Sequence, residues 1–314
     1  SGIVMPSGDT AYRGGRGRFV MIGGYTPAAL NTMDYVTISS TGNAVDFGDA
    51  SILLYMGAGT ASATRGLFHG FQGSPNDRNN RVDYITISST GNSFDFGDLT
   101  LAGQSANSAS ADQTRALFPI GYTNAATVSS KIDYFTISTT GNATNFGDLK
   151  DNKYSMKGGF SSPTRGFFAA GNQTPAPTTN AIEYVNIQST GNGIEFGDLV
   201  AGAHREGTGC SNATRGLMAS GSSGGDGEGQ TISYITMSSS GDSQTFGDLS
   251  ADMELAVGGA SATRGLFAGG TTPTKINTIS YVTIATTGDA SDFGDRTINV
   301  YGAAGCSDSH GGLG

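Results

Sequence analysis

The chain has 314 residues with a formal net charge of −9; 50 are glycine, and only 14% are charged. A nucleic-acid partner is not expected, because binding to phosphates depends on clustered lysine and arginine. No run of about 18 apolar residues predicts a membrane span, and the first residues lack the basic and apolar regions of a secretory signal.

Two sequence blocks recur along the whole chain. The first occupies residues 34–49 and reads Asp-Tyr-Val-Thr-Ile-Ser-Ser-Thr-Gly-Asn-Ala-Val-Asp-Phe-Gly-Asp, and five related copies follow it. The second, Thr-Arg-Gly-Leu-Phe, begins the other half of each unit and is divergent around Arg18. The units run over about 16–64, 65–113, 114–163, 164–213, 214–262 and 263–297, with terminal segments 1–15 and 298–314. We therefore expect one domain over 1–314, because no linker interrupts the repeat.

Each unit predicts the same elements in the same order. A strand begins at the arginine, as in 264–270, and ends at glycine. A second strand, such as 279–284, alternates β-branched and aromatic residues, and a Thr-Gly-Asn turn follows it. The Phe-Gly-Asp segment predicts a third strand, and a variable segment such as 255–259 predicts a fourth. No segment has a helical period.

Four strands in about fifty residues, repeated six times, predict an all-β, six-bladed β-propeller with four-stranded blades. An open β-solenoid is the main alternative. The tail from Ile298 matches the variable strand that precedes each Thr-Arg-Gly, so we expect it to pair with the first blade and close the ring. Residues 1–15 are expected to pair nearby.

The repeat residues resemble those of kelch-type propellers. Val20-Met-Ile-Gly-Gly24 and Leu266-Phe-Ala-Gly-Gly270 keep the double glycine, and the other units keep one glycine: Gly70, Gly121, Gly171 and Gly221. The chain has no tryptophan, and phenylalanine stands where kelch repeats carry it. The amino-acid sequences of both blocks also resemble repeats in structural proteins of marine bacteriophages, notably those of cyanobacteria. This resemblance implies a virion component, such as a fibre, decoration or adhesin subunit, that is made in the host cytoplasm.

One arginine and one aspartate recur in every unit. The arginines are Arg18, Arg65, Arg115, Arg165, Arg215 and Arg264. The aspartates that end Phe-Gly-Asp are Asp49, Asp98, Asp148, Asp198, Asp248 and Asp295. A ring of ligand-binding charges is one interpretation. We favour a structural role, in which each arginine is partly buried and donates to an aspartate or to turn carbonyls.

No constellation predicts catalysis, a metal or another cofactor. His69, His204 and His310 lack metal-ligand spacing, and no nucleophile elbow, P-loop or paired-cysteine motif occurs. A single calcium site at the Gly224–Glu228 loop is an open alternative. Cys210 and Cys306 fall in different units, so we expect free, buried thiols.

Binding is expected where the repeats differ, in the loop after the glycine strand and in the segment after Phe-Gly-Asp. The candidate binding residues there are Lys153, Tyr154, His204 and Arg205. The first hypothesis is a non-enzymatic virion structural or attachment subunit whose partners are other virion proteins. The alternatives are a lectin-like protein that binds host-surface glycan and an enzyme of the kelch class. A lectin predicts aromatics at equivalent loop positions, and Tyr25, Phe71 and Tyr122 make half of such a set.

Overall fold

The structure is a computed structural model, and it describes residues 17–72, 78–103, 108–123, 127–174, 178–200, 202, 204–222 and 229–313. In these ranges the regular elements are 26 strands and one 3-10 helix. The first sheet has the order β26-β1-β2-β3-β4-β5-β6 and contains β1 (Arg18–Ile22), β2 (Leu30–Thr37), β3 (Val45–Ala61), β4 (Arg65–Gln72), β5 (Asn79–Thr86), β6 (Phe94–Gly103) and β26 (Ala304–Ser307).

Four more sheets follow in chain order, and a short hairpin of two strands completes the set. Their strands are β7 (Ser110–Ala111), β8 (Arg115–Pro119), β9 (Lys131–Thr136) and β10 (Thr144–Asp148); β11 (Lys153–Tyr154), β12 (Gly158–Ser161), β13 (Arg165–Gln173), β14 (Thr178–Asn186) and β15 (Ile194–Asp198); β16 (Thr208–Ser211), β17 (Arg215–Ala219), β18 (Thr231–Thr236) and β19 (Gln244–Asp248); β20 (Val257–Ala260), β21 (Arg264–Ala268), β24 (Thr278–Thr283) and β25 (Ser291–Asp295); and the hairpin of β22 (Thr271–Thr272) and β23 (Thr274–Lys275). The 3-10 helix η1 covers Gly311–Leu313.

The prediction of one closed six-bladed propeller with four-stranded blades is wrong. The structure has 24 strands in five separate sheets of four to seven strands, besides the two-stranded hairpin, and none of these sheets closes on itself. The first two repeats share the seven-stranded sheet because β3 pairs with β2 through its first part and with β4 through its second. Residues 50–55, Ala-Ser-Ile-Leu-Leu-Tyr, contain no Gly, Pro, Asn or Asp, whereas 150–152 read Lys-Asp-Asn.

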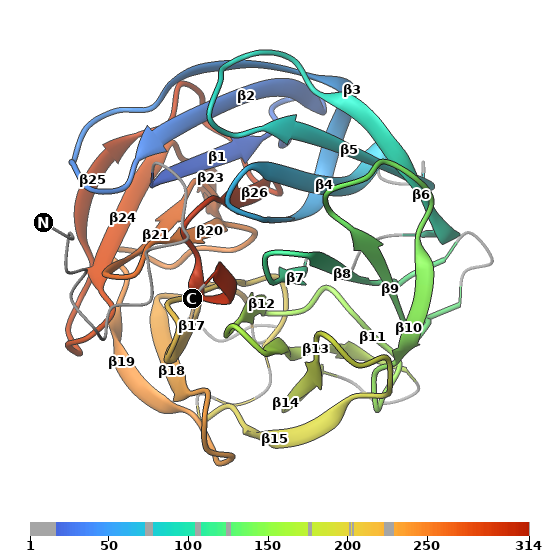
Figure 1. Cartoon of the computed structure of the whole chain (residues 1–314). Helices are drawn as coiled ribbons and strands as arrows, with labels where there is room; N and C mark the ends of the chain where they lie inside the picture. Colours follow the sequence, from blue (N-terminus) through green and yellow to red (C-terminus); the bar gives the residue numbers. More distant parts are fainter. Residues whose placement is uncertain are drawn as a thin grey trace, which may run out of the picture.

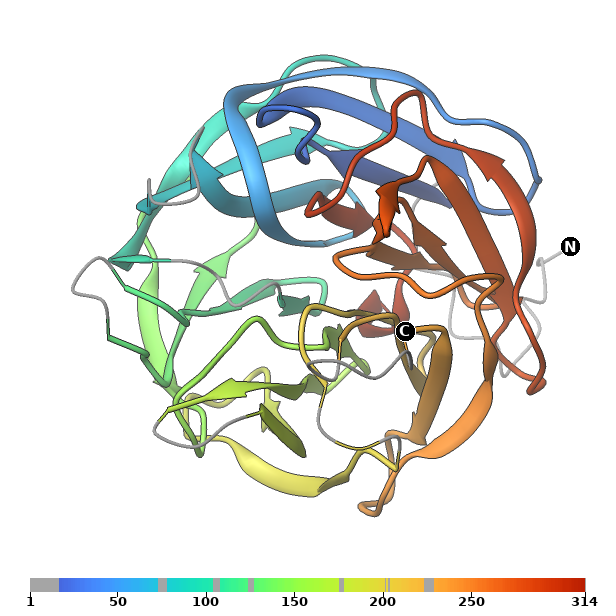
Figure 2. The same cartoon turned by 180° about the vertical axis from the view of Figure 1, so that it is seen from behind.

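The repeats follow one another around a common axis, with β26, the end of β3, β7, β12, β16 and β20 innermost (Figures 1 and 2). Each innermost strand contacts the next around the axis, and β20 contacts β26. The C-terminal strand β26 pairs antiparallel with β1, with Val20 opposite Cys306. Ends of the chain that are far apart in sequence therefore share one sheet.

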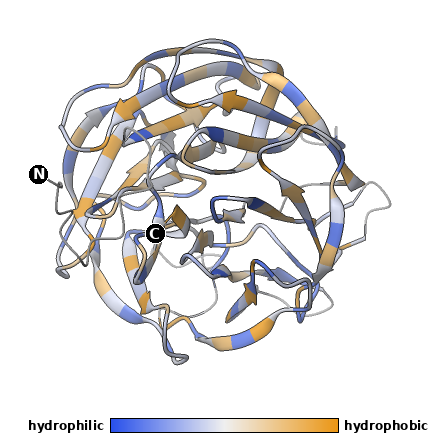
Figure 3. Ribbon diagram, viewed as in Figure 1, coloured by the Kyte–Doolittle hydropathy of each residue, from blue (hydrophilic) through white to orange (hydrophobic). Residues whose placement is uncertain are grey.

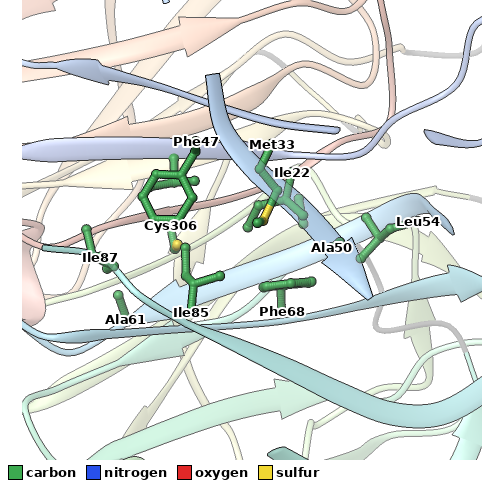
Figure 4. Packing of buried hydrophobic residues seen from close by; sticks show 12 residues of the cluster. Ile22, Met33, Phe47, Ala50, Leu54, Ala61, Phe68, Ile85, Ile87 and Cys306 are labelled. Carbon is green, nitrogen blue, oxygen red and sulfur yellow. The ribbon is translucent and has the colours of Figure 1, made fainter. Parts of the chain in front are cut away.

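The hydrophobic core lies between neighbouring repeats. One cluster joins Ile22, Met33 and Phe47 of the first repeat to Phe68 and Ile85 of the second (Figure 4). Apolar residues occur along strands of every sheet (Figure 3). Successive side chains point to opposite faces, and in β1 Phe19 and Met21 lie in one cluster while Val20 and Ile22 lie in another, so both faces of a sheet contribute to the core. Each repeat thus depends on its neighbours to bury its apolar residues.

The two cysteines are free and buried, as predicted. Cys306 lies in the cluster between the first two repeats, and Cys210 lies in the cluster between the last two. Burial raises the pKa of the Cys210 thiol to about 12, and that of Cys306 is raised as well. Both side chains therefore act as small apolar residues.

The C-terminal tail crosses one end of the axis. Asp308 exchanges hydrogen bonds with the backbone of Arg18, and Ser309 donates to the carbonyl of Ala260. His310 Nε2 lies 2.6 Å from the Ala61 carbonyl oxygen. A Cβ at Gly312 would lie 1.8 Å from the carbonyl oxygen of Ala111, so the tail fits only with glycine there. Figure 1 shows this end of the chain near the middle of the ring.

We call this the plugged end. The repeated arginines lie at the same end of the axis: Ala61, which His310 of the tail contacts, is opposite Gly66 in β4, and the preceding residue, Arg65, is opposite Thr86. The opposite end carries the loops that follow the arginine strands. The described residues include no helix that is long and apolar enough to cross a membrane. The predicted pairing of 1–15 and the candidate calcium loop Gly224–Glu228 lie outside the described residues.

Candidate functional site

The repeated arginines join each repeat to the next. Each guanidinium lies over the tyrosine of its own repeat, at 4.5–5.0 Å from the ring centroid. Each Nη1 also donates to a backbone carbonyl of the following repeat, as Arg165 does to Met237 at 3.1 Å. Arg264 closes the series by donating to Ile38 at 3.0 Å. The series uses both the flat face and the donors of the guanidinium.

The Phe-Gly-Asp motif is the second joint between repeats. The turn of the next repeat lies along its strand, so that Gly141 N donates to Phe96 O and Asn142 Oδ1 accepts from Asp98 N. The same bonds recur in all six repeats. A Cβ at Gly97 would lie 2.3 Å from the carbonyl oxygen of Gly141. The motif requires glycine because the neighbouring backbone approaches this closely.

The repeated aspartates contribute through their backbone amides, and no two of them share a repeat. Their residues are exposed or half-buried on the outermost strands. The six carboxylates therefore surround the molecule and do not converge on one ligand.

Sequence reasoning missed a set of buried acids that precede the repeat tyrosine. Asp34, Asp83, Asp133 and Glu183 are each at most 1% exposed. Each accepts a hydrogen bond from the segment after Phe-Gly-Asp of the preceding repeat, as Asp133 does from Thr100 N at 2.6 Å. Burial raises the pKa of Asp133, and the hydrogen bonds from Thr100 oppose that shift. An acid inside an apolar strand was the available signal.

Two of these acids form buried ion pairs. Arg296 Nη2 lies 2.9 Å from Asp34 Oδ1, and Lys153 Nζ pairs with Glu183. Lys153, a predicted binding residue, is fully buried in this pair. It holds repeats together and offers no accessible charge.

The other three predicted residues lie near one another at the end opposite the plug. Gly171 joins them: its amide donates to the His204 carbonyl, and a Cβ there would lie 2.9 Å from the Tyr154 carbonyl oxygen. His204 is fully buried, while Tyr154 and Arg205 are half-buried. Only these last two expose side chains to a ligand.

At this end, the described residues from Ser155 through Gly302 to Gly57 form a collar of backbone hydrogen bonds between neighbouring repeats. Met56, Ser155, Glu206 and Leu255 occupy equivalent positions and all have φ between 48° and 58°. Glu206 N donates to Ser155 O, Leu255 N donates to Glu206 O, and Gly302 N donates to Leu255 O. The bonds to neighbouring repeats maintain a left-handed conformation that side chains otherwise disfavour.

In the described residues, the side chains just before Met56, Ser155, Glu206, Leu255 and Gly302 form what we call the mouth ring: Tyr55, Tyr154, Arg205, Glu254 and Tyr301. Each pairs with the start of a loop, and these partners are Phe71, Asn172, Ser222, Thr271 and Tyr25. Unlike the motifs above, the mouth ring changes its chemistry from repeat to repeat. We take it as the candidate binding site.

The aromatic side of the mouth ring is a cluster of three tyrosines. The ring centroids of Tyr25, Tyr55 and Tyr301 lie 5.1–5.7 Å from one another. Burial and a hydrogen bond with Tyr301 raise the pKa of Tyr55, so its hydroxyl stays protonated. Phe71 stacks on Tyr55 and is itself buried. Of the three predicted loop aromatics, Tyr25 and Tyr122 are half-buried.

A narrow cavity of about 40 Å³ continues from the collar along the axis, and glycine and alanine supply most of its lining. Such a volume holds only a few water molecules, so a larger ligand stays at the mouth. Within the described ranges, no three His, Cys, Asp or Glu side chains are grouped to hold a metal ion. No protein-family model matches the chain, and no curated protein matches it.

Proposed function

We propose that the chain is a non-enzymatic structural or attachment subunit of a virus particle, which binds through the end opposite the plug. One observation carries this proposal: the residues common to all repeats are engaged in contacts between repeats, while the mouth ring varies. Selection for a stable framework accounts for the common residues, and the remaining variation is concentrated where a partner can reach it. The resemblance of the repeat blocks to those of marine bacteriophage structural proteins supports the virion as the location.

The partner in this proposal is another virion protein, contacted through the mouth ring and the loops around it. The framework favours such a role because its many joints hold the loops on a rigid support.

Copy counting tests this proposal. Density-purified particles from the source are digested, and the chain is quantified by mass spectrometry against a major capsid protein. We expect a fixed, symmetric copy number that persists through a second gradient. Absence from the particles, or a copy number that falls with each purification step, would contradict the virion role.

Glycan binding is the second candidate function, and the division of the mouth ring favours it. Tyrosines occupy one side and Arg205 and Glu254 the other, so the mouth can contact both the apolar and the hydroxyl-bearing parts of a sugar. A glycan array with the purified chain tests this function directly. Binding to a defined set of glycans is expected, and a blank array at high protein concentration would contradict it.

A further inference from the structure

Two groups of opposite charge, Lys275 and Glu206, lie at the mouth outside any salt bridge of the described residues. Other charges are paired within the protein: Lys153 with Glu183, Arg296 with Asp34, and Arg81 with Asp83. In the described part of the chain, neither Lys275 nor the carboxylate of Glu206 has an ion pair. The chain is strongly acidic, so a lysine without an ion pair gives this end a local positive charge that can attract an anionic ligand.

Lys275 lies on the aromatic side of the mouth. Its Nζ is 5.2 Å from the centroid of Tyr25 and 5.5 Å from that of Tyr301. The ammonium group has three N–H donors, and contact with the two rings leaves donors for an anion. The β22–β23 hairpin, which contains Thr271 and Lys275 in register, positions this side chain above the mouth.

Glu206 supplies the carboxylate of the site. It lies in the collar, where its backbone bonds to Ser155 and Leu255 fix its position. Collar bonds connect it through Leu255 to Gly302, which follows Tyr301 of the tyrosine cluster, and its charge raises the pKa of Tyr55. Burial and the charge of Glu254 raise the pKa of Glu206, whereas Arg205 lowers it. An ionised carboxylate accepts hydrogen bonds only, so it suits hydroxyl groups.

The geometry points to a binding site for a carboxylated glycan at the mouth, formed by Lys275, the tyrosine cluster and Glu206. The carboxylate of an acidic sugar binds the Lys275 ammonium, its ring lies against the half-buried Tyr25 and Tyr301, and its hydroxyls donate to Glu206. A neutral sugar leaves Lys275 unused. A nucleic acid brings a dense row of phosphates close to Glu206 and Glu254, which disfavours it. The inference rests on glycan binding, the second of the proposed functions.

Titration calorimetry with defined oligosaccharides tests the site. The probes are oligogalacturonate, a neutral oligosaccharide of equal length and a sulfated oligosaccharide of equal length. We expect the wild-type chain to bind oligogalacturonate at least ten-fold more tightly than the neutral probe. Lys275→Gln should weaken oligogalacturonate binding at least ten-fold and leave the neutral probe unchanged. Tyrosine fluorescence gives a second readout, because the chain has no tryptophan.

Lys150→Gln is the matched control, because Lys150 is an exposed lysine outside the mouth ring that pairs with Glu195 on the outer strand β15. It should bind like the wild type. Equal loss in both variants, or in neither, would overturn the site but leave glycan binding in place. Equal affinity for acidic and neutral probes, or a preference for the sulfated probe, would overturn the carboxylate assignment. If no probe binds, both the site and glycan binding fail, while presence in particles would still support the virion role.

Discussion

The two ends of the central axis are built on different principles. At the plugged end, the tail and the repeated arginines satisfy their polar groups within the protein, and each repeat supplies the same contacts. At the opposite end, the collar has the same backbone conformation in successive repeats, but its side chains differ. The mouth ring next to it consists of Tyr55, Tyr154, Arg205, Glu254 and Tyr301. The difference shows that a repeat can fix its framework through shared residues and still vary one surface. Substitutions at the two ends should therefore have opposite effects on stability and on binding.

The largest expected effect is at the buried ion pair between the last and first repeats. Arg296→Ala leaves Asp34 buried and unpaired, which should reduce the free energy of unfolding by about 3–5 kcal/mol. Equilibrium urea unfolding measures this change. Adding Asp34→Ser should recover much of the loss, because Ser233 and Ser280 occupy that position in two other repeats. A single variant as stable as the wild type would show that the pair does not join the repeats.

Loss of one arginine joint should be somewhat less damaging. Arg165→Ala removes a charged hydrogen bond to Met237 and the contact with the Tyr184 ring, which together should cost about 2–4 kcal/mol. Arg165→Lys keeps the charge but not the planar fork, so an intermediate loss is expected. Thermal melting of the three proteins checks the order, and an unchanged melting temperature for Arg165→Ala would refute the structural role.

Two glycines with nearly the same φ allow the effect of the close contact at Phe-Gly-Asp to be measured separately from the effect of backbone strain. Gly97 (φ 150°) lies against the next repeat, whereas Gly91 (φ 151°) has nothing within 4 Å of an added Cβ. Both substitutions to alanine incur strain, but only Gly97→Ala also overpacks, so it should lose about 2 kcal/mol more. Urea unfolding compares them. Equal losses would mean that the neighbouring turn yields easily.

The plug should weaken in acid. Gly312 N donates to His310 Nδ1, so Nε2 carries the proton and donates to Ala61, and protonation of Nδ1 would break the first bond. Burial lowers the pKa of His310, opposed by the Ala61 bond and by Asp112. Its folded pKa lies below its unfolded value, so stability at the plug is lost as pH falls below about 6.5, by at most about 1.4 kcal/mol per pH unit.

Hydrogen exchange of the tail amides at pH 7 and pH 5 measures this effect after correction for the intrinsic exchange rate. His310→Gln keeps the hydrogen-bonding pattern without the titration, so its tail protection should not depend on pH. His69→Gln is the control, because His69 lies between the carbonyls of Arg81 and Gly103, away from the tail. If hydrogen-exchange protection of the wild-type tail does not depend on pH, the prediction is contradicted.

The smallest effect is expected at the mouth. Lys275→Gln removes no ion pair of the described residues but loses the contacts of the ammonium with the Tyr25 and Tyr301 rings, so the free energy of unfolding should fall by about 1 kcal/mol or less. Thermal melting checks this value before any binding experiment. A large loss of stability would place Lys275 in the framework.

The sequence predicts what is local and repeated. The strand at each arginine, the turn and the Phe-Gly-Asp strand follow from patterns within one unit. The sheet boundaries do not follow from these patterns. The strand β3 continues through 50–55, where Gly, Pro, Asn and Asp are absent, and a repeat consensus hides that difference. The partners of Asp34 and Asp133 lie in the preceding repeat, and the mouth ring forms only when all repeats surround the axis. A sequence pattern found within one unit therefore could not predict the contacts between units.

Hydrogen exchange with and without oligogalacturonate, measured along the whole chain, tests binding at the mouth most directly. We expect slower exchange around Glu206, Glu254, Lys275 and Tyr301, with no change in the tail or in the outer turns. Protection at the tail or along the outermost strands, with an unchanged mouth, would contradict the claim that this protein binds through its variable end.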